Sequence, residues 1–294
     1  MDVNALRQFL VVAQHEHLSR AARELHIAQP ALSRTIGRLE AQLGVELFDR
    51  RDRMRLNAAG SIYRAHVQRA LGELDAGARA IDEAQQMGAG RVAVAAESLF
   101  TLMGALGAFK RASPRTEITL SQGSSDDLVQ GLHAWESDLA LLSQPARGGQ
   151  LRIRELVREQ VHLATPVGHP LAGREAVSME ELATEPFVTT RRGHWQRELL
   201  ERLFAARGLA PRIVCVSDEP GATAGMISAG IGIGLLPRMA RMWSDEAPIA
   251  WADVDDPQCM RVLSLAWRPD LSDEGAPARL RDHLMRWDWS QGAL

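Results

Sequence analysis

Hydrophobic positions recur at three- and four-residue spacing along the first 43 residues, and they predict three short helices. The first stretch runs from Val3 to His15 and the second from Leu18 to Leu25, with a turn at 26–28 before the third. The third opens at Gln29-Pro30 and ends before Gly44, because proline costs no hydrogen bond in a first helical turn and glycine ends helices. Three short helices with a tight second turn predict a helix-turn-helix.

A polar tip between two short apolar stretches, 45–48 and 54–56, predicts a β-hairpin wing directly after the third helix. From Ala58 to Met87 the helical pattern continues without proline behind the N-cap Asn57, which predicts a helix about 45 Å long. Its apolar positions form a heptad-like seam, which predicts pairing with a second copy of the chain; packing on its own domain is the alternative. The seam consists of Val67, Leu71, Leu74, Ala78 and Ile81.

After Gly90 short apolar strands alternate with helical stretches, and this order predicts two α/β lobes. The first set is β-α-β-α-β from Arg91 to Leu142, which implies a parallel sheet with right-handed crossovers. A second set runs from Val161 to Leu236, and a last strand, Arg261–Trp267, and helix, Ala278–Trp287, are expected to pack back on the first lobe. The fold class is therefore α/β multidomain. We expect a winged helix-turn-helix at 1–58, a linker helix at 59–88 and a two-lobed domain at 89–294, with lobe 1 at about 89–162 plus 267–294 and lobe 2 at about 163–266.

Length and composition are those of a folded protein with more than one domain. The chain has 294 residues, of which 46% are hydrophobic and 24% charged, close to globular averages. The N-terminus lacks a basic segment followed by an apolar run, and no run of about eighteen apolar residues occurs, so we expect a cytoplasmic protein with no membrane partner. Cys215 and Cys259 are too few for a disulfide framework and are expected to be small buried hydrophobes.

The net charge of −3 hides a basic excess near the N-terminus. Residues 1–60 hold nine arginines against seven acidic residues, a charge of +2, which leaves −5 for the rest of the chain. A local basic face, and not the total, marks nucleic-acid binding. The excess is concentrated in Arg50, Arg51, Arg53 and Arg55.

The third predicted helix and the wing carry the candidate DNA-binding chemistry. A major groove admits one α-helix, whose N-terminal side chains must donate to bases and phosphates. We expect Gln29 and Arg34 to read bases, Arg38 to reach the backbone, and the arginine-rich tip to neutralise phosphates or enter the minor groove. A solvated arginine face on an ordinary helix is the alternative. The candidates are Gln29, Pro30, Ser33, Arg34, Thr35, Arg38, Arg50, Arg53 and Arg55.

Residues 6–60 also carry a diagnostic set of small, apolar and polar positions. They are Ala21-Ala22, Gln29-Pro30-Ala31, Ser33, Ile36, Leu39-Glu40, Leu43-Gly44, Leu47-Phe48, Arg50 and Gly60. This set resembles the DNA-binding module of LysR-type transcriptional regulators. Two positions depart from the family pattern: His17 replaces the usual Ser before the second helix, which weakens a phosphate contact, and Asn57 replaces Thr while keeping the helix cap. Segments beginning at Asp138, Val167 and Met226 are similar to landmarks of the family's sensor domain, and residues 120–130 resemble the subgroup that includes regulators of glutamate and nitrogen metabolism.

The resemblance implies a periplasmic-binding-protein architecture, with two α/β lobes joined by crossover strands and a small-molecule effector between them. Ligands of open α/β sheets sit at the carboxyl ends of strands, where helix N-termini present free N–H groups. Hydroxyls and helix termini favour an anion, so we expect a small carboxylate, with Arg191, Arg192 and His194 as further positive charge. A plain N-cap or solvated loop residue is the alternative for each. The expected effector contacts are Ser98, Leu99, Gly123, Ser124, Thr189, Thr190 and Glu219.

The resemblance further implies a homodimer or homotetramer on double-stranded promoter DNA, in contact with RNA polymerase and without a cofactor. The sequence contains no G-x-S-x-G, phosphate-binding loop or H-E-x-x-H, so we expect no enzyme. Residues 230–234 are spaced wrongly for a dinucleotide loop and predict a tight turn in the second lobe. A solute-binding protein, which would need an export signal, and a cytosolic α/β transferase, which would need a catalytic set, are the rival interpretations.

Overall fold

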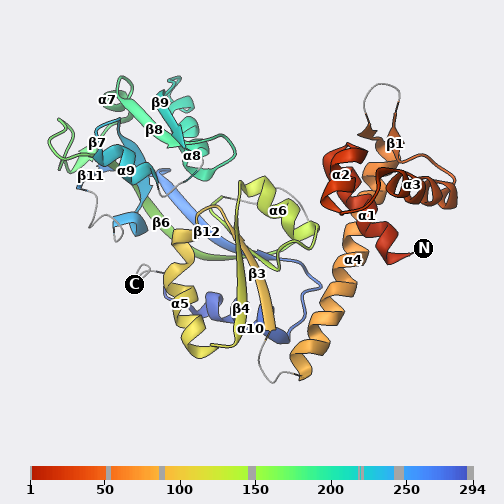
Figure 1. Ribbon diagram of the computed structural model, residues 1–294. Helices are drawn as coiled ribbons and strands as arrows, with labels where there is room; N and C mark the ends of the chain where they lie inside the picture. The colour runs from red at the N-terminus through yellow and green to blue at the C-terminus, as the bar shows by residue number, and fades with distance from the viewer. Residues whose placement is uncertain are drawn as a thin grey trace. The chain divides into compact units, whose positions relative to one another are not determined.

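The computed structural model in Figure 1 describes residues 2–50, 54–85, 90–144, 150–217, 219, 222–241 and 248–289. The chain forms two compact units. The first comprises Met1–Asp82 with His133–Glu136, and the second comprises Glu83–Leu132 with Ser137–Leu294.

Three helices build the N-terminal unit, with the bounds that the sequence pattern predicts at nearly every end. They are α1 (Val3–His15), α2 (Leu18–Glu24) and α3 (Gln29–Leu43). Their apolar faces meet in a core centred on Phe9, Leu32 and Ile36. The α3 helix starts with proline in its first turn and ends where Gly44 takes φ of 69°, a left-handed conformation that glycine adopts without strain.

A two-stranded hairpin follows α3 and confirms the predicted wing. Its strands, β1 (Phe48–Asp49) and β2 (Arg55–Leu56), pair antiparallel and are shorter than the predicted stretches. The Asn57 side chain then caps α4 (Ala58–Gln85) by accepting from the Gly60 backbone N–H at 2.8 Å. A β-carbon at Gly60 would lie 2.1 Å from the Leu47 carbonyl oxygen, so only glycine lets α4 approach the wing this closely.

The heptad-like seam of α4 divides into two parts. Val67 and Leu71 are buried in the core of their own N-terminal unit. Leu74 and Ile81 are 57% and 61% exposed. The first part of the seam therefore packs on its own chain, which is the alternative that the sequence left open, and only the second part stays uncovered.

The first lobe of the second unit contains the predicted β-α-β-α-β order. Its elements are β3 (Gly90–Ala96), the 3₁₀ turn η1 (Leu99–Leu102), α5 (Met103–Ala112), β4 (Thr116–Gln122), α6 (Ser125–His133) and β5 (Leu139–Leu142). Strand β3 is parallel to both β4 and β5. The last helix, α10 (Gly275–Arg286), lies with the first lobe (Figure 1) and packs on β3 and α5, as expected. Trp289 belongs to the same core.

The second lobe contains the predicted strands and helices and three further elements. The predicted elements are β8 (Pro186–Thr190), α8 (Trp195–Ala205), β9 (Arg212–Ser217), α9 (Ala222–Ser228) and β10 (Gly234–Pro237). The elements that the pattern missed are β7 (Ala176–Val177), α7 (Met179–Leu182) and β11 (Ile249–Val254). Gly232 lies against β8, where a β-carbon would come within 2.4 Å of the Pro186 carbonyl oxygen, so this glycine-rich segment serves close packing.

Two long antiparallel strands connect the lobes. They are β6 (Arg152–Pro166) and β12 (Met260–Trp267), and the sheet order is β4-β3-β5-β12-β6-β11-β7. Leu263 and Leu265 of β12 pack in the first lobe's core, whereas Val161 of β6 packs in the second lobe's core. The expected lobe limits at 162 and 266 therefore fall inside the connecting strands. The sequence pattern found only the second half of β6, because the first half is largely exposed and alternates charged with apolar residues.

Candidate DNA-binding and ligand-binding sites

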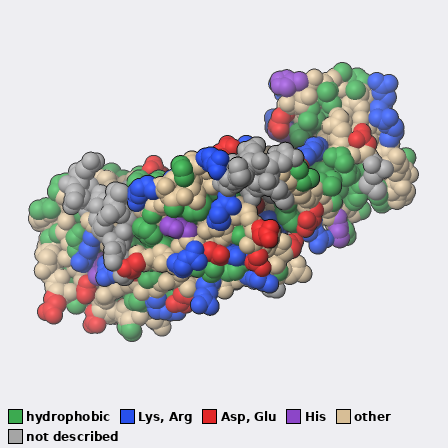
Figure 2. All heavy atoms as spheres, turned by 90° about the horizontal axis from the view of Figure 1, so that it is seen from below, with side chains coloured by type: hydrophobic (Ala, Val, Ile, Leu, Met, Phe, Trp, Pro, Cys, Tyr) green, Lys and Arg blue, Asp and Glu red, His purple; other side chains and the backbone are tan. Residues whose placement is uncertain are grey.

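One edge of α3 faces outward, as the helical period requires. Leu32, Ile36 and Leu39 are buried on the opposite side. The exposed edge carries four of the predicted residues, Gln29, Pro30, Arg34 and Arg38, while Ser33 and Thr35 are half-buried. Figure 2 shows Lys and Arg side chains gathered along one edge of the N-terminal unit.

Arg34 and Arg38 make only weak contacts within their own helix. The Arg34 Nε donates to the Pro30 carbonyl at 3.3 Å, and an Arg38 Nη donates to the Thr35 hydroxyl at 3.5 Å. Within the described residues neither guanidinium forms an ion pair. Both side chains can therefore turn to a phosphate or a base with little loss of internal bonding.

The wing is tied to α3 through a buried carboxylate that the sequence interpretation did not recognise. Glu40 is buried and accepts from the Leu47 backbone N–H at 2.8 Å and from Arg50 at 2.7 Å. Arg50, which was expected to contact phosphate, thus also forms an ion pair with Glu40. Arg55 is exposed on β2, and Arg53 lies outside the described residues.

The expected effector residues divide into buried hydroxyls and surface caps. Ser98 and Thr189 are buried at the ends of β3 and β8, with Leu99 half-buried beside Ser98. The Thr190 hydroxyl is buried and makes no hydrogen bond within the described chain. A buried hydroxyl without a partner costs free energy unless a water or a ligand supplies one.

Ser124 forms hydrogen bonds of the N-cap kind at the start of α6. Its hydroxyl donates to the Asp127 carboxylate at 2.6 Å, and its backbone N–H donates to the same carboxylate at 2.9 Å; these two bonds hold the pKa of that carboxyl below its usual range. Gly123 lies beside the same cap. Glu219 is exposed, and its backbone N–H donates to the Ser217 hydroxyl at 3.0 Å.

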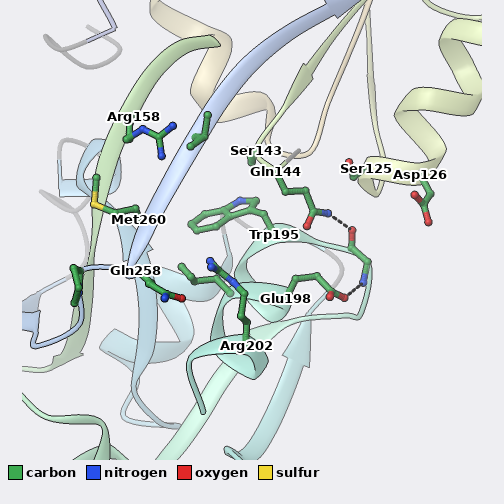
Figure 3. Close-up of a pocket in the computed structure, with 14 residues that line it drawn as sticks. Ser125, Asp126, Ser143, Gln144, Arg158, Trp195, Glu198, Arg202, Gln258 and Met260 are labelled. Atoms are coloured by element: carbon green, nitrogen blue, oxygen red, sulfur yellow. Dashed lines mark hydrogen bonds between the residues drawn. The ribbon is translucent and has the colours of Figure 1, made fainter. Parts of the chain in front are cut away.

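A cavity of about 700 Å³ lies among α6, α8, β6 and β12 of the second unit (Figure 3). Ser125, Gln144, Arg158, Trp195, Arg202 and Met260 are among its lining residues. None of the seven expected effector residues lines this cavity. Sequence reasoning missed it because the first half of β6 and the 257–262 segment showed no strong hydrophobic period.

Next to the cavity a buried polar network joins the two lobes. Glu97 is fully buried at the end of β3 and accepts from the Ser143 N–H at 2.8 Å and from the Trp195 N–H at 3.0 Å. Burial raises the pKa of Glu97 to about 7, although those hydrogen bonds and the charge of Arg261 act in the opposite direction. Arg261 is itself buried, donates to Glu159 at 2.7 Å and lies 5.0 Å from the centre of the Trp195 ring.

A winged helix with a basic edge, together with a two-lobed α/β unit that encloses a cavity, defines a DNA-binding regulator with a ligand-binding domain. Residues 3–61 match the family described as bacterial regulatory helix-turn-helix protein, lysR family, and residues 83–288 match the LysR substrate binding domain. The chain belongs to the LysR family of transcriptional regulators. This is a family of regulators and not of enzymes.

Relatives and solved structures agree with this assignment over nearly the whole chain. The chain is 33% identical to the HTH-type transcriptional regulator YybE of Bacillus subtilis over 91% of its length and 92% of the relative's. It is 34% identical to the transcriptional dual regulator GltC of the same organism, over 90% of each. The crystal structure of CbnR, a LysR family transcriptional regulator, is 24% identical with a TM-score of 0.69 over 97% of this chain and 99% of that one. HinK from Pseudomonas aeruginosa is 26% identical with a TM-score of 0.57, over 97% and 98%.

Among the helices of the described residues, none is both long and apolar enough to cross a membrane.

Both cysteines are free thiols. Cys259 is buried, and burial raises the pKa of its thiol to about 12, whereas Cys215 is half-buried. Cys259 therefore behaves as the small buried hydrophobe that the sequence predicted.

Proposed function

We propose that this regulator reads promoter DNA with the exposed edge of α3. The observation that carries the proposal is that Arg34 and Arg38 lie on that edge without an ion pair in the described chain. In this proposal Gln29 and Arg34 contact bases, Ser33 and Thr35 contact either a base or a phosphate, and Arg38 contacts the backbone. Pro30 starts the helix, and the wing arginines Arg50, Arg53 and Arg55 lie along phosphates or in the minor groove. A solved structure of full-length CbnR, which shares this fold, is a complex with that protein's target DNA.

The test measures DNA binding by fluorescence anisotropy at several salt concentrations. It compares the DNA upstream of the gene that encodes this protein with a duplex of scrambled sequence. Arg34→Ala is expected to lose roughly 1–3 kcal/mol on the specific site and to relax base preference. Arg38→Ala is expected to weaken both duplexes alike and to reduce the salt dependence. Arg212→Ala, which removes an exposed arginine of β9, is the matched control. The proposal is contradicted if all three variants bind both duplexes with the same affinity as the unchanged protein.

We propose that two copies pair through the exposed part of α4, giving a homodimer or a homotetramer. Leu74 and Ile81 leave an apolar surface that water contacts in the single chain, and pairing would remove it. The double variant Leu74→Glu, Ile81→Glu is expected to dissociate the assembly in sedimentation equilibrium. Glu73→Lys on the same helix serves as the charge-changing control, and an unchanged mass for the double variant refutes this interface.

We propose that a small carboxylate binds at the strand ends formed by Ser98, Leu99, Gly123, Ser124, Thr189, Thr190 and Glu219. The buried Thr190 hydroxyl without a hydrogen bond in the described chain supports a ligand there. A thermal-shift screen of carboxylates tests it, since a ligand at a hundred times its dissociation constant adds about 2.7 kcal/mol to stability. Thr190→Val is expected to weaken the best carboxylate, and retained affinity in that variant counts against the site. We further propose that this regulator contacts RNA polymerase and acts in the cytoplasm.

A further inference from the structure

The 700 Å³ cavity carries both signs of charge on its walls. Arg158 of β6 and Arg202 of α8 are its cations, and Asp126 of α6 and Glu198 of α8 are its anions. Figure 3 shows Arg158 and Asp126 on opposite sides of the cavity, with Trp195 between them. The lining charges sum to zero, so the cavity has two poles and not a single sign.

Three of these four charged groups retain bonding capacity, while Glu198 already accepts from the Gly193 backbone N–H at 3.2 Å. Asp126 accepts no hydrogen bond from a described residue, and its side chain is exposed to the cavity. Arg202 donates to no described residue, although its charge acts through space on Asp256. Arg158 has one exposed ion pair, with Glu155 at 3.1 Å. A ligand with opposite charges at its two ends would therefore find a partner at each pole.

The cavity wall is mixed: Ser143, Gln144 and Gln258 are polar, and Trp195 lies in its apolar part. Trp195 is 4% exposed, and its indole N–H is buried without an acceptor in the described residues. The ring is held in place by Arg261, whose guanidinium lies 5.0 Å from the ring centre. Leu199, Met260 and Val262 complete the apolar lining. A buried N–H without an acceptor indicates an absent polar partner, and the apolar walls suit a hydrocarbon body.

We infer that this cavity binds a zwitterion of the amino-acid class, with its carboxylate toward Arg158 and Arg202, its ammonium toward Asp126 and Glu198, and its side chain along Trp195. A simple carboxylate satisfies only the basic pole and brings a negative charge near two carboxylates, which disfavours it. The cavity shares no residue with the cluster proposed above for a carboxylate, although its Gly193 lies against Ser124 of that cluster. The two proposals can therefore fail independently.

The test uses the full chain and a thermal-shift screen of the standard amino acids, followed by calorimetry. The best amino acid is then compared with two analogues, one lacking the ammonium and one lacking the carboxylate; for phenylalanine these are 3-phenylpropanoate and 2-phenylethylamine. Each analogue is expected to bind about tenfold more weakly or worse, the value of one charge-assisted hydrogen bond. If no amino acid shifts the melting temperature at millimolar concentration, or if 3-phenylpropanoate binds as well as phenylalanine, the inference is wrong.

Variants locate the ligand. Arg202→Gln and Asp126→Asn are each expected to weaken the amino acid about tenfold. Arg212→Gln on β9 and Thr190→Val in the other cluster are expected to leave its affinity unchanged. Loss of amino-acid binding in Thr190→Val with retention in Arg202→Gln assigns the ligand to the strand-end cluster and overturns the inference. Folding of each variant is checked by its melting temperature without ligand.

Discussion

Raising the pH from about 5 to about 8 is expected to destabilise the second unit through Glu97. Burial raises the pKa of this carboxyl from 4.5 to about 7 in the folded chain, so between these values the folded state holds a proton that the unfolded state has lost. The stabilising contribution of the proton is complete below the unfolded pKa and is lost as the pH passes through the folded pKa. This shift of the Glu97 pKa corresponds to a change in folding stability on the order of 3 kcal/mol, because each pKa unit is worth about 1.36 kcal/mol.

The assay is urea unfolding followed by tryptophan fluorescence across this pH range. All seven tryptophans lie between residues 135 and 289, so the signal reports mainly the second unit. The reference is Glu97→Gln, which is neutral at every pH and nearly the same size. The free energy of unfolding of the unchanged protein, minus that of Glu97→Gln, is expected to fall by roughly 3 kcal/mol as the pH rises. Taking this difference cancels the titration of every other group.

Glu155→Gln provides the matched control, because Glu155 is exposed and its loss should give a nearly flat difference. Parallel curves for the unchanged protein and Glu97→Gln would mean that Glu97 ionises without a burial penalty. That result would refute the reasoning. A fall in the difference at acid pH, instead of toward neutral pH, would mean that the two backbone donors and Arg261 outweigh desolvation.

Three further predictions concern the packing of both units. Gly60→Ala is expected to cost about 1–3 kcal/mol in thermal unfolding, because its β-carbon would press on the Leu47 carbonyl; an unchanged melting temperature contradicts the close approach. Glu40→Ala leaves the Leu47 N–H without its acceptor and is expected to cost about 1–3 kcal/mol and to weaken DNA binding, measured by unfolding and anisotropy. Arg261→Met leaves Glu159 buried and unpaired and is expected to cost about 3–5 kcal/mol, while adding Glu159→Gln should recover part of that loss; additive costs would exclude a coupled pair.

The local structure of the N-terminal unit follows from the pattern of its residues. The bounds of α3 follow from Pro30, Gly44 and the apolar period, since helix ends are set by residues within one turn of them. The exposed edge that carries Arg34 and Arg38 follows from the same period. The order of strands and helices in the first lobe was also predicted, because each is a continuous segment with its own pattern, whereas the second lobe has three short elements, β7, α7 and β11, that the pattern missed.

Contacts between residues far apart in the sequence became known only from the folded chain. Glu97 accepts from residues 46 and 98 positions away, and no local pattern pairs them. The seam of α4 shows the same limit: its spacing indicated a buried stripe, but only packing revealed that Val67 lies in its own core and Leu74 does not. The cavity walls come from four elements, one of which is half polar and exposed. The spacing of hydrophobic residues predicts which side chains of one helix or strand are buried. A binding site depends instead on which side chains from distant parts of the sequence lie together in the folded chain.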